Sequence, residues 1–282
     1  LSGNAENLYI LAETSLERIL DSVTEIQPEI VVVDSIQTIG TESIEASIGS
    51  LSQVKECAAR ILQYAKEKNV VVENTPGQNA NAVAELVFGL LVYTVRCFYT
   101  GKAGTELKGK KLGILAFGNV GRNVARIAKG FGMEVFAYDA FCPKAAIEDA
   151  GVHAADSQEQ LFEQCDIVSL HIPATPETRE SINYALVNKM KKGGILINTA
   201  RKEVINEAEL IKLLSERNDL KYITDIKPDA DAEFAQFEGR YFATPKKMGA
   251  QTAEANTNAG IAAACQINAF FKNGCTKYQV NK

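Results

Sequence analysis

The sequence predicts an α/β fold in which a doubly wound parallel sheet is joined to a smaller N-terminal α/β lobe. Two observations carry this prediction. Short apolar runs of strand length alternate along the chain with segments whose apolar residues recur at helical spacing. A glycine-containing turn at residues 118–121 separates one such run from the helical pattern that follows it. With 282 residues, the chain is long enough for two domains.

The first 73 residues are predicted to form two strand–helix units and a third strand. Residues 8–12, 30–33 and 70–72 are the apolar runs expected as strands. Thr14 and Glu17 have the spacing of a capping box at the start of the first helix. The apolar faces of the two helices consist of Leu16, Ile19, Leu20, Val23 and Ile26, and of Val54, Cys57, Ala58, Ile61, Leu62 and Ala65.

A break and a strongly apolar helix come next. The tripeptide Thr-Pro-Gly at residues 75–77 interrupts the chain, since proline and glycine favour turns. The helix that follows is predicted from the spacing of Val83, Leu86, Val87, Leu90 and Leu91.

Residues 112–139 have the order strand, tight turn, helix, strand and acidic end that binds dinucleotides in parallel sheets. At residues 118–121, glycine lets the backbone approach a pyrophosphate, and the start of the helix supplies free N–H groups. Asp139 can accept hydrogen bonds from both ribose hydroxyls and would repel a 2′-phosphate, which favours NAD over NADP. Ala116 stands where the pattern usually has its first glycine. The alternative interpretation is a βαβ crossover without a ligand.

A cation follows the buried strand predicted at residues 195–198. Arg201 stands at the carboxyl end of this strand, where α/β sheets place ligands, and a guanidinium can hold a carboxylate by two parallel hydrogen bonds. The alternative is a surface arginine at the entry to a helix. Residues 252–271 are predicted to form a long alanine-rich helix near the C-terminus.

Composition narrows the function classes. The net charge of -5 and the pI of about 5.3 argue against a nucleic-acid partner or an anionic membrane surface. No apolar run reaches the roughly 18 residues of a membrane span. The start, LSGNAEN, is no signal peptide and lacks Met, which hints that the true start is missing. Six scattered cysteines, with His153 and His171 outside metal-ligand spacing, predict no metal site and reduced thiols in a cytoplasmic protein.

The blocks NTPGQNANAVAEL, LKGKKLGILAFGNVGRNVARIAKGFGMEVFAYDAF, CDIVSLHIPATPETRESINYALVNKMKKGGILINTARKEVINEAEL, YITDIKP and TPKKMGAQTAEANTNAG carry a family resemblance. From about residue 70 onward, the chain resembles the D-2-hydroxyacid dehydrogenases, and more narrowly the short D-3-phosphoglycerate dehydrogenases. The resemblance implies a Rossmann NAD-binding domain at residues 74–252 and a C-terminal helix at 253–282 that returns to the N-terminal lobe. It also implies a small 2-hydroxy or 2-keto acid as substrate, a place in serine biosynthesis, and a homodimer.

The resemblance implies a catalytic pair. Arg201 matches the family's catalytic arginine. Lys247 stands where the family has its acid/base histidine, with Lys246 as the neighbour that could take its place. A lysine there favours the reductive direction, because a solvated lysine is protonated near neutrality and so can donate a proton but rarely accept one. The family's orienting glutamate is replaced by Ala230, which leaves the two flanking residues, Asp229 and Asp231, without an assigned role.

Cofactor contacts also follow from the resemblance. They comprise the pyrophosphate turn, the ribose ligand, the wall around the adenosine half, the nicotinamide side, the acid that holds the carboxamide, and the loop over the ring. In that family's pattern these positions are Gly118, Asn119, Val120, Gly121, Asp139, His171, Pro173, Thr178, Thr199, Ala200, Arg201, Asp225 and Gly249.

The blocks NLYILAETSLERIL, EIVVVDSIQTI and GSLSQVKECAARILQYAKE, within residues 1–69, resemble an internal slice of the RadA-type DNA-repair ATPases. Asp34 would match the carboxylate near Mg²⁺, but no GxxxxGK[ST] loop occurs to hold phosphates. Residues 1–73 would then stand in place of the substrate domain. The chain reads as a natural fusion, an engineered chimera or an assembly artefact.

Three functions follow as hypotheses. The first is an NAD-dependent dehydrogenase whose turnover is impaired by the missing substrate loops. The second is a catalytically silent NAD-binding chimera, and the third is a fragment of a DNA-repair ATPase.

Overall fold

The computed structural model describes residues 7–282, which divide into two compact units. The first contains residues 7–74 and 266–282, and the second is Thr75–Cys265. Among residues 7–282, no helix combines the length and the apolar composition that crossing a bilayer requires.

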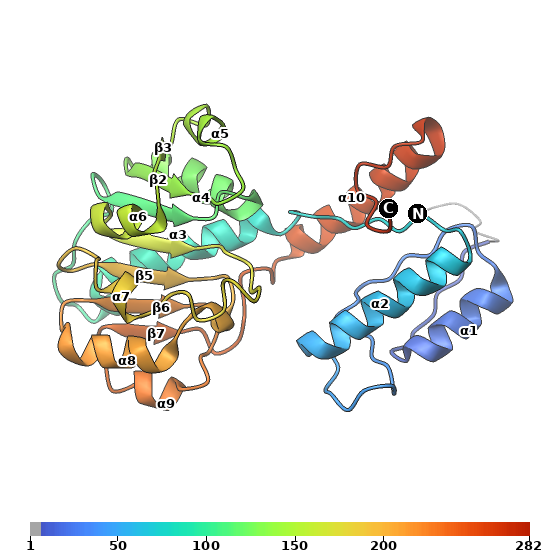
Figure 1. The fold of residues 1–282 in the computed structure, drawn as a ribbon, viewed down its shortest axis with the longest axis horizontal. Helices are drawn as coiled ribbons and strands as arrows, with labels where there is room; N and C mark the ends of the chain where they lie inside the picture. Colours follow the sequence, from blue (N-terminus) through green and yellow to red (C-terminus); the bar gives the residue numbers. More distant parts are fainter. Residues whose placement is uncertain (1–6) are drawn as a thin grey trace. The chain divides into compact units, whose positions relative to one another are not determined.

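The second unit is built on a seven-stranded sheet in which every neighbouring pair is parallel (Figure 1). The strand order is β3-β2-β1-β4-β5-β6-β7, so the direction of winding reverses between β1 and β4. This confirms the doubly wound α/β prediction. The strands are β1 Lys111–Leu115, β2 Glu134–Tyr138, β3 His153–Ala154, β4 Ile167–Leu170, β5 Ile195–Asn198, β6 Lys221–Thr224 and β7 Tyr241–Ala243.

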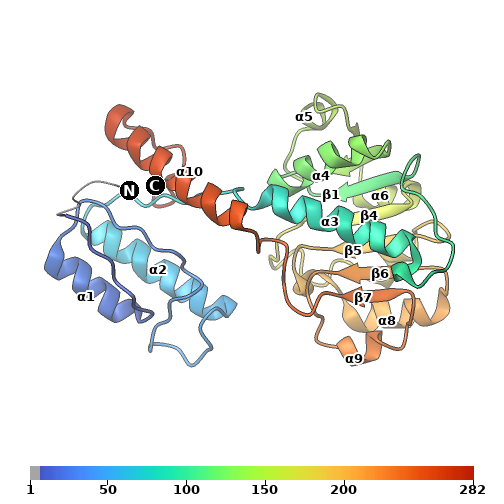
Figure 2. The same ribbon diagram turned by 180° about the vertical axis from the view of Figure 1, so that it is seen from behind.

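Helices cover both faces of the sheet, with α3 and α4 on one side and α6, α7 and α8 on the other (Figures 1 and 2). All residues of β4 and β5 are therefore buried, which explains why their sequences are continuous apolar runs. The helices are α3 Ala80–Val95, η1 Cys97–Tyr99, α4 Asn119–Gly130, α5 Lys144–Glu148, α6 Gln158–Gln164, α7 Tyr184–Val187, η2 Lys202–Val204, α8 Glu207–Glu216 and α9 Asp231–Phe234.

Successive residues along a strand point to opposite faces of the sheet and pack into two separate hydrophobic cores. Leu112 and Ile114 of β1 pack with the buried faces of α3 and α4. Leu115 of the same strand packs with α6 through Leu161 and Phe162. This division follows from the two-residue period of a strand.

The first unit contains α1 Leu16–Ile26 and α2 Leu51–Glu67, as predicted, and the last turns of α10 Ala253–Asn273. Its small core consists of Leu16, Ile39 and Cys57. The helix start differs from the prediction, because Ser15 and not Thr14 caps α1, with its hydroxyl accepting from the N–H of Arg18.

The three strands predicted at residues 8–12, 30–33 and 70–72 are wrong. None of these segments forms a ladder with another described residue, and the unit has only isolated bridges, Ser15 with Gly40 and Glu73 with Gln279. Residues 30–33 are 38–66% exposed. A strand of a parallel sheet needs a neighbour that bonds its N–H and C=O groups, and strand-like composition alone does not supply one.

One polar cluster links the helices of this unit. Glu17 accepts from the hydroxyl of Thr41 at 2.6 Å and pairs with the guanidinium of Arg60. The hydrogen bond from Thr41, and then Arg60, lower the pKa of Glu17 to about 2 against a smaller opposing effect of burial. Gln53 is buried beside them and bonds the backbone of Thr41 in both directions.

Candidate functional site

The candidate site lies at the carboxyl ends of β1 and β4, where the winding of the sheet reverses. Open α/β sheets bind ligands at this position because the loops that leave neighbouring strands separate there. A depression of about 210 Å³ occupies it, and it is lined by Gly77, Asn79, Ala80, Gly118, Asn119, Val120, Gly121 and His171.

The turn after β1 is shaped for a close approach of backbone to ligand. Ala116 has φ of 78°, a left-handed conformation that favours the glycine usual in this pattern. A Cβ on Gly121 would lie 2.3 Å from the carbonyl oxygen of Ala116, so only glycine lets α4 start this close to β1. At Gly118, by contrast, a Cβ would meet nothing within 4 Å, which leaves open space on the side of the depression. The first N–H groups of α4 have no intrahelical partner and suit a pyrophosphate.

Asp139 lies one residue beyond β2 and is held by backbone donors. Its carboxylate accepts from the N–H groups of Phe117, Phe141 and Cys142 at 2.7–2.8 Å. Burial acts to raise the pKa of Asp139, but these hydrogen bonds and the charge of Arg122 outweigh it and lower the pKa. The carboxyl is therefore charged near neutrality, as a ribose ligand must be.

The loop after β4 is fixed by hydroxyl groups. His171 is half-buried, and its Nε2 lies 2.9 Å from Oγ of Ser169. Burial lowers the pKa of His171 to about 3, so the ring is neutral and unsuited to hold a charge beside a pyrophosphate. Further along, the hydroxyl of Thr178 donates to the carbonyl oxygen of Pro173 at 2.6 Å, which closes the loop.

At the end of β5, Asn198 is fully buried and builds the turn that presents Arg201. Its amide donates to the carbonyl oxygen of Arg201 and accepts from the N–H of Ala200, both at 2.9 Å. Thr199 is 4% exposed, and its hydroxyl has no partner among the described residues. An unpaired buried hydroxyl is costly, so this atom fits a site that a polar ligand group completes.

Arg201 and Lys247 meet at one oxygen atom, the carbonyl of Ala200. Nη1 of Arg201 donates to it at 2.8 Å and Nζ of Lys247 at 3.4 Å. Lys247 is exposed as a residue, but its ammonium end reaches back against the protein. Burial of that end, followed by the charge of Arg201, lowers the pKa of Lys247. The sequence placed these two residues in one site, and the structure brings them together.

The loop that carries Lys247 is anchored on Asp225. This carboxylate is fully buried and accepts from the N–H groups of Met248 and Gly249 at 2.9 and 2.8 Å, and from the hydroxyl of Thr244 at 3.0 Å. A Cβ on Gly249 would lie 3.0 Å from the same carboxylate, so glycine allows this contact. The sequence predicted Asp225 as the acid that holds the carboxamide. In the structure its bonds go to the loop.

The two aspartates that flank Ala230 pair elsewhere. Asp229 forms an ion pair with Lys202, and Asp231 pairs with Lys227 and accepts from Tyr241. The carboxylates whose charges act on Lys247 are Asp225 and Glu203.

Sequence reasoning missed Asn198, Gly77 and Asn79. A short polar side chain at a strand end, where it can bond the backbone two residues on, was the available signal for Asn198. For Gly77 and Asn79 the local sequence pattern contained no such signal, because these residues reach the site from the segment before α3.

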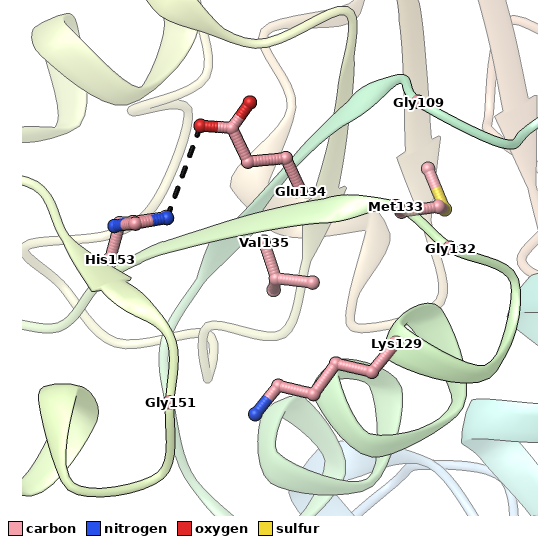
Figure 3. A pocket seen from close by; sticks show the side chains of 8 residues that line it. All are labelled: Gly109, Lys129, Gly132, Met133, Glu134, Val135, Gly151 and His153. Carbon is pink, nitrogen blue, oxygen red and sulfur yellow. Dashed lines mark ion pairs between the residues drawn. The ribbon is translucent and has the colours of Figure 1, made fainter.

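A larger depression of about 410 Å³ lies at the opposite edge of the sheet, among the segments that enter β1, β2 and β3 (Figure 3). Glu134 and His153 face each other there at 3.9 Å, and Lys129 donates to the carbonyl oxygen of Ala150. It is far from the strand ends that carry Arg201 and the glycine turn. We therefore place the candidate site at the smaller depression. Within residues 7–282, no group of histidine, cysteine and acidic side chains is arranged to hold a metal ion.

Comparison with known proteins gives the family. Residues 96–242 match the model of the D-isomer specific 2-hydroxyacid dehydrogenase NAD binding domain. The chain is 35% identical over 285 residues to hydroxypyruvate reductase of Thermotoga maritima, covering 92% of this chain and 89% of that protein. It is 32% identical over 236 residues to D-3-phosphoglycerate dehydrogenase of Methanocaldococcus jannaschii, covering 78% of this chain but only 45% of that protein's length.

Among solved structures, the NAD⁺-bound 3-phosphoglycerate dehydrogenase of Entamoeba histolytica is similar, with a TM-score of 0.72 and 37% identity over 97% of this chain and 87% of that one. This match extends over most of residues 1–73, and none of these relatives supports a RadA-type segment there. The free helix N-terminus, the charged Asp139 and the orphan hydroxyl of Thr199 all fit the dinucleotide that the family model implies. This chain belongs to the D-isomer specific 2-hydroxyacid dehydrogenases, an oxidoreductase family, and its cofactor is NAD.

Proposed function

We propose that the chain interconverts a small 2-hydroxy acid and its 2-keto acid. We further propose that the hydroxy acid is 3-phosphoglycerate and the keto acid is 3-phosphohydroxypyruvate, as in serine biosynthesis. The observation that carries the proposal is the meeting of Arg201 and Lys247 at the carbonyl of Ala200, at the same edge of the sheet as the glycine turn. Support for the phosphorylated substrate comes from the two phosphoglycerate dehydrogenases. The similarity to a hydroxypyruvate reductase supports an alternative substrate, hydroxypyruvate without a phosphate group.

The roles of the side chains follow from their chemistry. NAD, when bound, supplies or accepts the hydride. The guanidinium of Arg201 binds the substrate carboxylate and fixes the orientation of C2. In the reductive direction the ammonium of Lys247 donates a proton to the carbonyl oxygen as it becomes a hydroxyl group, which leaves the amine neutral. In the oxidative direction the neutral amine takes that proton, and the lowered pKa of Lys247 makes this form accessible.

Asp225 has no imidazole to orient, but its bonds to Met248 and Gly249 hold the backbone on which Lys247 stands. The family pattern and their position at this edge of the sheet assign a further set of residues to the cofactor. They are the turn at 118–121, Asp139, His171, Pro173, Thr178, Thr199, Ala200 and Gly249.

The test measures NADH oxidation with 3-phosphohydroxypyruvate, hydroxypyruvate and glyoxylate. Lys247→Met is expected to lower kcat of reduction about 100-fold or more, because general acid catalysis contributes at least this much. Lys246→Met is the matched control and is expected to stay near wild type. Equal losses in the two variants would exclude Lys247 as the specific acid, and preference for hydroxypyruvate would exclude the phosphorylated substrate.

A second candidate is an NAD-binding chain without turnover. The absence of strand pairing at residues 8–12 and 30–33, within the part of the chain that the structure describes, favours it, because the first unit then offers no sheet on which to build a substrate pocket. NADH binding with no turnover on any of the three keto acids would establish this alternative. A RadA-type origin of residues 1–69 stays a hypothesis. A sequencing read across residues 68–74 of the source DNA would decide between a real fusion and an assembly artefact.

Homodimer formation and a cytoplasmic location also stay predictions. Light scattering of the purified chain at several concentrations would test the first.

A further inference from the structure

Two positively charged side chains of the candidate site share one neutral acceptor. Nη1 of Arg201 donates to the carbonyl oxygen of Ala200 at 2.8 Å, and Nζ of Lys247 donates to the same oxygen at 3.4 Å. The two nitrogens therefore lie no farther apart than the sum of these distances. A carbonyl oxygen accepts both hydrogen bonds, but it does not cancel the repulsion between two cations.

No carboxylate neutralises this pair by direct contact. Within residues 7–282, neither Arg201 nor Lys247 forms an ion pair with an acidic side chain. The carboxylate of Asp225 is taken up by hydrogen bonds from the loop that carries Lys247, and Glu203 acts on the ammonium by its charge alone. An anionic group placed between the two cations would therefore be stabilised by both.

The amine of Lys247 is suited to acquire such a group covalently. Burial of the ammonium end, and then the charge of Arg201, lower the pKa of Lys247 against smaller opposing effects of Asp225 and Glu203. A larger fraction of this side chain is therefore neutral than in a solvated lysine, and a neutral amine beside another cation is a nucleophile. Carbon dioxide is an uncharged electrophile, small enough to reach this nitrogen without a pocket of its own.

We propose that Lys247 is a carbon dioxide acceptor, and that Arg201 holds the resulting carbamate. The lone pair of Nζ forms a bond to the carbon of CO₂, one C=O bond gives its π electron pair to its oxygen, and the nitrogen loses one proton to water. The product carries a negative charge where the ammonium carried a positive one. Its two oxygens match the planar fork of a guanidinium, so a contact between like charges becomes an ion pair.

The modification inhibits the proposed reaction in two ways. The carbamate nitrogen no longer donates the proton that the keto acid needs, and the carboxyl group on it occupies the guanidinium that would bind the substrate carboxylate. Dissolved carbon dioxide therefore inhibits reduction reversibly. The covalent step at Lys247 stands without the proposed function, whereas the inhibition rests on it.

The experiment detects the adduct directly. The full chain is equilibrated with isotope-labelled carbon dioxide at constant pH and ionic strength, the carbamate is trapped with a trialkyloxonium salt, and mass spectrometry locates the label. Wild type is expected to carry it at Lys247, and Lys247→Met should lose it. Lys246→Met removes an exposed neighbour in the same loop and is the matched control that should keep it. Arg201→Lys retains a positive charge but not the fork, so the labelled fraction at Lys247 should fall about tenfold.

Absence of label at Lys247 in wild type would overturn the proposal, and so would an equal labelled fraction at Lys247 in Arg201→Lys. A second measurement follows NADH oxidation with 3-phosphohydroxypyruvate or hydroxypyruvate. Carbon dioxide should slow wild type and sodium chloride of equal ionic strength should not; equal rates in the two would overturn the inhibitory role. Failure of the proposed function looks different, because there is then no turnover with or without carbon dioxide while Lys247 is still labelled.

Discussion

Gly121→Ala should destabilise the second unit and weaken NADH binding. The new Cβ would lie 2.3 Å from the carbonyl oxygen of Ala116 and 3.1 Å from Cγ2 of Ile114. Ordinary contact begins at 3.4 Å, so the start of α4 and the turn must separate by roughly 1 Å. Because the nearer atom is backbone and cannot rotate away, we expect a loss of about 3 kcal/mol, the upper end of the range for overpacking.

Thermal denaturation measures this loss as a fall in Tm of roughly 6–12 °C for a unit of this size. Gly130→Ala is the matched control, since Gly130 ends the same helix and a Cβ there meets nothing within 4 Å. Its Tm should equal or exceed that of wild type. Gly118→Ala separates folding from binding: its Cβ also meets nothing within 4 Å, so Tm should hold while NADH affinity falls. The reasoning is refuted if Gly121→Ala and Gly130→Ala melt together.

Three further predictions concern single groups. Thr199→Val should raise the stability of the cofactor-free protein by about 1 kcal/mol, because the buried hydroxyl has no partner among residues 7–282, and should weaken NADH binding; a destabilised variant with unchanged affinity would contradict this. The reductive kcat/KM should fall with rising pH at a pH below the ordinary lysine pKa, since protonated Lys247 is the proposed donor and its pKa is lowered; a pH profile of Lys247→Met that keeps the same fall would exclude Lys247 as the donor. Glu17→Gln should cost the first unit about 1 kcal/mol at pH 7, after allowance for solvent screening. The carboxylate has a folded pKa of about 2 against 4.5 unfolded, so its contribution is present above pH 4.5 and is lost as the pH falls toward 2. Acid unfolding curves of wild type and Glu17→Gln that stay parallel down to pH 2 would disprove it.

The sheet could be predicted from sequence because its central strands are buried on both faces. Such strands are continuous apolar runs, and the residues that follow them lie at the ligand-binding edge by topology alone. That argument suffices for Arg201 and for the turn at residues 118–121. It does not reach Lys247, which only the family resemblance placed in the same site.

Other features depend on contacts between residues far apart in the chain. The bonds from the 244–249 loop to Asp225 and from the N–H of Phe117 to Asp139 join segments that no local pattern relates. In the first unit, residues 30–33 have the apolar composition of a strand, but the predicted strand is wrong, because a strand forms only where a partner segment pairs with it.

The lysine at position 247 brings a second kind of reactivity with it. A neutral primary amine is a nucleophile toward ketones, and it forms an imine with release of one water molecule, whereas an imidazole forms no such stable adduct. Burial and Arg201 lower the pKa of Lys247 and so increase the neutral fraction, and its Nζ lies 3.4 Å from the carbonyl oxygen of Ala200. A 2-keto acid that stays bound in the proposed site could therefore be captured covalently by the residue proposed as its acid. Borohydride would make such an adduct permanent, and its mass would identify the keto acid that the site holds.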